Sequence, residues 1–86
     1  MADESLRRLK TLLEKEANVE PALTEHIIAT HQLASVADLS SFWPGDEYQK
    51  GVESDMLANT TWQGNRLQAA RLRVAVELSR SELGHP

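Results

Sequence analysis

The sequence of 86 residues contains no cysteine. Disulfide bonds and thiolate metal sites are therefore excluded. Because small secreted domains usually depend on disulfides for their stability, this absence favours an intracellular location, in the cytoplasm or the nucleus. The first residues, Met1-Ala2-Asp3-Glu4, are acidic where a signal peptide needs basic residues. No apolar run approaches the roughly 20 residues that span a bilayer, so we expect no membrane association.

The sequence also lacks an excess of positive charge, since Lys and Arg number 9 against 13 Asp and Glu, for a net charge of −4. Nucleic-acid-binding domains are usually basic, although a local patch can oppose the mean charge. Catalytic motifs are missing too: there is no Gly-x-Ser-x-Gly nucleophile elbow and no glycine-rich phosphate loop. We therefore expect no enzymatic activity, no cofactor and no small-molecule substrate.

The residues that could bind a metal or act as catalytic acids do not have the spacing or the surroundings that such sites need. A pair of histidines on one helix face needs a spacing of three or four, whereas His26 and His31 are five apart and His85 is distant. The carboxylate pairs Asp46-Glu47 and Glu53/Asp55 fall on a predicted polar helix surface, whereas a catalytic acid needs an apolar pocket. We expect no metal site and no catalytic residue.

Apolar residues recur at spacings of three and four, which predicts helices and no strands. Pro21 suits a first helical turn, and the predicted N-caps are Ser35, Asp46 and Asn65. Trp43 and Trp62 are expected to close the core where loops cross it, the alternative being an exposed aromatic anchor.

The prediction is an all-α, compact five-helix bundle with a long C-terminal helix. Its helices span about 5–17, 21–31, 35–42, 46–59 and 65–82, in one domain over 5–82 with flexible tails at 1–4 and 83–86.

The last predicted helix carries two apolar stripes, where a surface helix in a monomer needs one. The first stripe, taken as the one that faces the core, comprises Leu67, Ala70, Val74 and Leu78. The second lies on nearly the opposite side and comprises Ala69, Leu72, Val76 and Leu83. Two explanations are open. Either the helix is central and packs on both sides, or the second stripe, with Leu72 and Val76, contacts a partner.

Arg66, Arg73 and Arg80 follow one another at intervals of seven, so they share one side of this helix and form a basic ridge between the stripes. Such a ridge is either a solvated face or a binding surface. As a binding surface it would contact a protein or, as an alternative function, a nucleic acid.

Two segments resemble the sterile alpha motif (SAM) family. In His31-Gln32-Leu33-Ala34-Ser35-Val36-Ala37-Asp38-Leu39 an aliphatic residue precedes a capped helix that ends in Asp-Leu, and Gly64-Asn65-Arg66-Leu67 is similar to the Gly-His-Arg start of the family's long helix. The resemblance implies a helical interaction module that pairs an acidic mid-domain surface with a basic surface at the start of the last helix. The acidic candidates are Asp46, Glu47, Glu53 and Asp55, and the basic candidates are Arg66, Arg71 and Arg73.

The sequence thus predicts a non-catalytic protein–protein interaction module, one domain of a larger intracellular protein, that binds a protein partner or a second copy of itself through the last helix. Nucleic-acid binding through the ridge of Arg66, Arg73 and Arg80 is the alternative. Opposite charges on two different surfaces would suit head-to-tail contacts.

Overall fold

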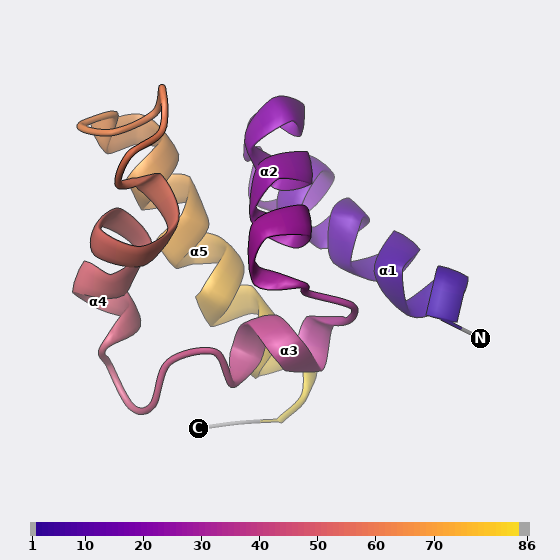
Figure 1. Ribbon diagram of the computed structural model, residues 1–86. Coiled ribbons are helices and arrows are strands. Elements are labelled where there is room, and N and C mark those ends of the chain that lie inside the picture. Colours follow the sequence, from indigo (N-terminus) through magenta and orange to yellow (C-terminus); the bar gives the residue numbers. More distant parts are fainter. Residues whose placement is uncertain (1, 85–86) are drawn as a thin grey trace.

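Short helices joined by turns pack beside one long C-terminal helix (Figure 1). A computed structural model describes residues 2–84, and in that range it contains no strand. The elements are α1 (Ala2–Thr11), which continues as the π-helical segment η1 (Leu12–Glu16), then α2 (Pro21–His31), α3 (Val36–Ser40), α4 (Tyr48–Gly51), which continues as the π-helical segment η2 (Val52–Leu57), and α5 (Arg66–Glu82). The predicted all-α fold with a long last helix is confirmed.

The helix starts follow the capping residues, with one exception. Pro21 occupies the first turn of α2. Ser35 accepts a hydrogen bond from the Asp38 backbone N–H at 3.3 Å, and Asn65 accepts one from Gln68 N–H at 3.1 Å. The prediction that Asp46 caps a helix is wrong. Residues 44–47 form a turn, so the helix begins two residues later at Tyr48, and Asp46 contributes its backbone carbonyl to Gln49 N–H instead.

The first helix begins at Ala2, so residues 2–4, expected to belong to a flexible tail, lie within α1. At the other end, Leu83 and Gly84 form a turn after α5. Met1, His85 and Pro86, which belong to the tails that the sequence predicts to be flexible, lie outside the described residues.

The face of α5 that points into the core is the opposite of the expected one. Leu72 and Val76 are 0% exposed, and the smaller Ala69 and Ala75 beside them are buried as well. The stripe predicted to face the core instead points outward at Leu67, Ala70 and Val74, while Leu78 is half-buried. The helix therefore packs on one side only, through Ala69, Leu72 and Val76 of what we expected to be its second stripe, while Leu83 of that stripe is 43% exposed. The other large, fully buried side chains of the core include Leu9, Leu12, Leu13, Leu23, Ile27, Leu39, Val52, Met56 and Leu57.

The two tryptophans occupy different environments. Trp43 is buried at 5% exposure, which confirms that its ring closes the core. Trp62 is half-buried against the core, and its Nε1–H donates to the Glu20 carboxylate at 2.5 Å. Both rings are therefore tied to neighbouring elements, and only Trp62 retains a partly exposed surface.

A buried hydroxyl in α2 provides a first test of the packing. Thr24 is 0% exposed, and within the described part of the chain its Oγ1 has no hydrogen-bond partner. An unsatisfied buried polar group costs roughly 1–3 kcal/mol, so Thr24→Val, which keeps the shape, should raise the free energy of unfolding by about 1 kcal/mol. Urea denaturation measures this, with the exposed Thr30→Val as the matched control. A loss of stability in Thr24→Val would show that the hydroxyl is in fact satisfied.

Candidate interaction surface

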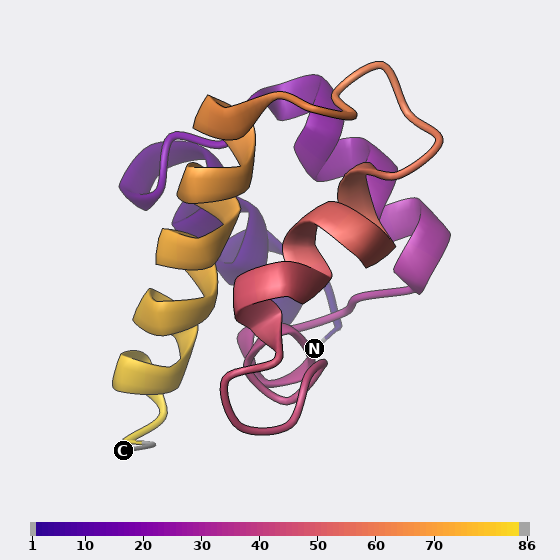
Figure 2. The same ribbon diagram turned by 90° about the vertical axis from the view of Figure 1, so that its left-hand side faces the viewer.

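One side of α5 exposes apolar side chains to solvent. Leu67 is 57% exposed and Val74 43% exposed, and the exposed Ala70 lies between them. On a helix of 3.6 residues per turn these three fall within about 60° of one another. We call Leu67, Ala70 and Val74 the outer face of α5. Figure 2 shows α5 along one edge of the molecule, beside α4. Large exposed hydrophobic residues elsewhere in the region 2–84 are confined to Leu83.

Two arginines lie on either side of the outer face. Arg66 precedes Leu67 and is exposed, and no ion pair involves it within residues 2–84. Arg71, on the other side, is half-exposed, and its Nη1 donates to the Asn18 carbonyl at 3.0 Å. Both belong to the basic candidates predicted from the sequence. The hydrogen bond of Arg71 uses one of the five donors that a guanidinium carries.

The other members of the predicted arginine ridge are held by contacts within the domain. Arg80 donates from Nε to the Ser40 carbonyl at 3.2 Å, from Nη2 to the Trp43 carbonyl at 2.8 Å, and from Nη1 to the Gly45 carbonyl. Its guanidinium also lies 4.8 Å from the centre of the Tyr48 ring, a cation–π distance. Arg80 therefore fastens the loop before α4 to α5.

Arg73 makes a similar internal link. Its Nε donates to the Gln49 carbonyl at 2.7 Å, and its Nη2 pairs with the Glu53 carboxylate at 2.5 Å. The three arginines of the ridge do share one side of α5, but the guanidiniums of Arg73 and Arg80 bond to other groups of the domain. Leu72 and Val76, predicted as partner-binding residues, are buried in the core and are not on the surface.

The acidic candidates are divided between two places. Asp46, Glu47 and Asp55 line a groove of about 470 Å³ beside Trp43. Asp55 accepts a hydrogen bond from Trp43 Nε1–H at 2.7 Å, which fixes the tryptophan ring. Glu53 points elsewhere, because it pairs with Arg73. The structure therefore brings three of the four acidic residues together and assigns the fourth to α5.

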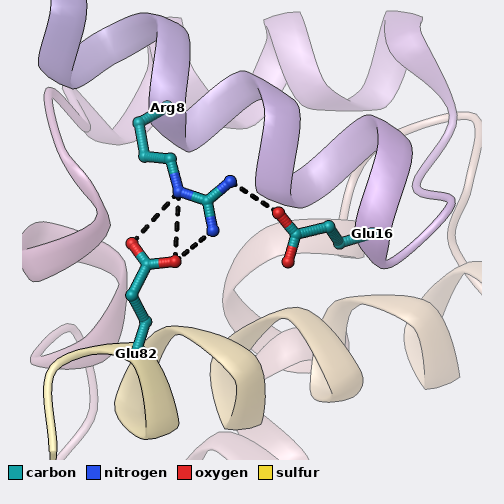
Figure 3. Close-up of polar contacts among 3 residues, drawn as sticks. All are labelled: Arg8, Glu16 and Glu82. Carbon is teal, nitrogen blue, oxygen red and sulfur yellow. Dashed lines mark hydrogen bonds and ion pairs between the residues drawn. The ribbon is translucent and has the colours of Figure 1, made fainter.

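A polar cluster that the sequence did not predict joins the first and last helices (Figure 3). Arg8 donates from Nε to the two Glu82 oxygens at 3.1 and 3.2 Å, and from Nη1 to Glu16 at 2.5 Å. The bond to Arg8 lowers the pKa of Glu82, and the two carboxylates raise the pKa of Arg8. Arg8 and Glu82 are separated by 74 residues, so no local pattern could reveal the pair.

The lowered pKa of Glu82 predicts how stability depends on pH. A carboxyl group whose folded pKa lies below its unfolded value contributes stability that is present above the unfolded value, near 4.5, and is lost as pH falls through the folded value. Glu82→Gln should therefore cost about 1 kcal/mol or less at pH 7, as for other partly exposed ion pairs. The difference from wild type should shrink as the pH falls below about 4.5. Urea denaturation at pH 7 and at successively lower pH values measures this, with the exposed Glu47→Gln as control; a difference that does not shrink below pH 4.5 would contradict it.

In the range 2–84 no group of three or more His, Asp or Glu residues is placed to hold a metal ion. None of the helices described is long and apolar enough to cross a membrane. The outer face of α5 is apolar, whereas the groove beside Trp43 is lined by acidic side chains.

The comparisons with known proteins point to one family. Residues 1–80 match the family described as the Luciferase/LBP N-terminal domain. A curated relative, the dinoflagellate luciferase of Lingulodinium polyedra, is 29% identical over 75 residues, which cover 79% of this chain but 6% of that protein. No solved structure matches. The family matched is not the SAM family, so the SAM resemblance stays a prediction.

Proposed function

The chain belongs to the Luciferase/LBP N-terminal domain family, and on that basis we propose that it is a non-catalytic protein-interaction domain of a larger, intracellular protein. It binds another polypeptide through the outer face of α5. The relative supports the first part of this proposal, because the segment similar to this chain is 6% of a much longer polypeptide there. The polypeptide that such a domain binds can be another part of the same chain or a protein bound to that chain.

The exposure of Leu67 and Val74 is the observation that carries the proposal. Fully burying a leucine or valine side chain contributes about 1.5–3 kcal/mol, so a partner that covered the exposed half of both would gain roughly 2 kcal/mol from them. Arg66 and Arg71 beside them add polar contacts at the rim. An apolar centre with a charged rim is the usual composition of a protein interface.

The nucleic-acid alternative receives less support from the geometry. It would use Arg66, Arg73 and Arg80, but Arg73 and Arg80 are engaged with Glu53 and with backbone carbonyls. A phosphate backbone would then meet Arg66 alone from this ridge, on a chain of net charge −4. Phosphate binding depends on several neutralising cations.

A site-specific photo-cross-linker at Val74 tests the proposal in an extract of the source organism. We expect one discrete cross-linked polypeptide, identified by mass spectrometry. The matched control carries the cross-linker at the exposed Ala29 of α2 and should give no such product. Excess unlabelled wild-type domain should compete, whereas Leu67→Asp with Val74→Asp should not. Equal products at the two positions, or equal competition by the variant, would exclude the outer face of α5 as the binding surface.

A further inference from the structure

We infer that the segment bound at the outer face of α5 is an amphipathic helix whose apolar stripe is bordered by Asp or Glu residues. This inference rests on the proposed function and specifies the chemistry of the partner. It is carried by the shape of the outer face and by the charges beside it.

The apolar part of the surface is long, straight and narrow. From Leu67 through Ala70 and Val74 to the half-buried Leu78, it follows the axis of α5 for about 17 Å, at 1.5 Å per residue. A helix of about three turns has an apolar stripe of the same length, because its own residues repeat at spacings of three and four. Ala70 in the middle is small, which allows the two helix axes to approach to the usual 8–10 Å.

The charges beside the first two turns of the stripe are positive. Arg66 lies on one side and Arg71 on the other, so acidic residues on both borders of a partner helix would each meet a guanidinium there. Glu77 is exposed further along, on the Arg66 side, and accepts a hydrogen bond from Tyr48 Oη at 2.9 Å, so the positive border is confined to the first half of α5. Glu82, further along, is bonded to Arg8. Complementary charge at the rim of an interface sets the orientation and the choice of partner.

A second copy of the chain fits this surface less well. In a two-fold contact between two α5 helices, the stripe from Leu67 to Val74 is centred between Ala70 and Arg71, so Arg71 of one copy would face Arg71 of the other. Like charges in that position repel. A separate, acidic helix avoids this repulsion.

A random library of 16-residue peptides displayed on phage tests the inference. The bait is the wild-type chain, and phage that bind the Leu67→Asp with Val74→Asp variant are removed first. We expect the surviving peptides to carry apolar residues at i, i+3 or i+4, and i+7, flanked by Asp or Glu, and to become helical on binding by circular dichroism. Their affinities are then measured by fluorescence anisotropy.

Two double variants with the same change in net charge test whether the affinity for the selected peptides depends on the arginines beside the outer face or only on the net charge of the domain. Arg66→Glu with Arg71→Gln should weaken the binding of the selected peptides roughly tenfold, as expected for the loss and reversal of rim ion pairs. Arg7→Glu with Lys15→Gln changes exposed residues of the first helix and should alter the affinity by less than about twofold. Equal weakening in the two variants, or none in either, would overturn the acidic character of the partner.

The outcomes distinguish this inference from the proposed function. Peptides that depend on Leu67 and Val74 but carry basic or uncharged borders would overturn the acidic helix and leave the outer face as a binding surface. A library that yields no peptide able to discriminate wild type from the Leu67→Asp with Val74→Asp variant would overturn both. Self-association in sedimentation that is abolished by Val74→Asp would assign the surface to a second copy.

Discussion

Replacing Leu72 by aspartate is expected to abolish the cooperative unfolding transition of the domain. Leu72 is 0% exposed and lies at the centre of the buried side of α5. Truncating a buried leucine to alanine alone costs about 2–5 kcal/mol, and an unpaired buried carboxylate adds several kcal/mol more. Folded domains have only about 5–15 kcal/mol of stability in total, and a chain this short buries less surface than most. The variant should be unfolded at 25 °C.

Leu67→Asp is the matched control, because it makes the same substitution on the same helix but on the other side. Leu67 is 57% exposed, so the change in the free energy of unfolding should stay within about 0.5 kcal/mol. Thermal and urea unfolding followed by circular dichroism measure both variants. If Leu67→Asp unfolded the domain while Leu72→Asp left it intact, the orientation of α5 described here would be reversed.

The orientation of α5 shows where sequence reasoning stops. The helix itself was predictable from Asn65 to Glu82, because its cap and its period are local properties. The choice between its two apolar stripes was not, since both carry leucine, valine and alanine. Long-range contacts decide it: buried Gln68 accepts a hydrogen bond from Glu20 N–H at 3.0 Å, 48 residues away. Ser79, also on the buried side, donates from its hydroxyl to the Val76 carbonyl at 2.6 Å, so both polar side chains there have partners.

The candidate site was likewise predictable only in its local features. The row of Arg66, Arg73 and Arg80 follows from a spacing of seven, but the acceptors of Arg80 are backbone carbonyls 35 to 40 residues away, and every residue type offers a carbonyl. A spacing rule therefore identifies which arginines share a side of the helix and does not identify which are free. Arg66 differs from the others because it lies in the first turn of α5, beyond the reach of the loop that Arg80 fastens.

The second large effect is expected for Gly51→Ala, which should destabilise the domain although alanine usually stabilises a helix relative to glycine. Within a helix, alanine is favoured over glycine by about 1 kcal/mol. At Gly51, however, an added Cβ would lie 2.6 Å from Trp43 Cε2 and 2.7 Å from Cδ1, and closer still to Nε1. The absence of a side chain at this position is what allows the indole ring to lie against the helix.

The ring of Trp43 has little freedom to move away from such a methyl group. It is buried at 5% exposure, its Nε1–H is bonded to Asp55 at 2.7 Å, and its centre lies 4.7 Å from that of Phe42. Gly51→Ala must therefore displace the ring and stretch or break the bond to Asp55. Overpacking of this kind costs about 1–3 kcal/mol, and the loss of this partly buried hydrogen bond adds to it, so we expect a net destabilisation of about 2 kcal/mol.

A double-mutant cycle separates the clash from any intrinsic effect of alanine. In a Trp43→Leu background, which is itself less stable, the smaller side chain leaves room for the methyl group, so Gly51→Ala should become neutral or stabilising there. The coupling between the two positions should reach about 2 kcal/mol in urea denaturation, within the range measured for residues in contact. Lys50→Ala, at the exposed neighbouring position, should change stability by less than about 0.5 kcal/mol. A stabilising Gly51→Ala in the wild-type background would mean that the indole does not lie against this turn of the helix.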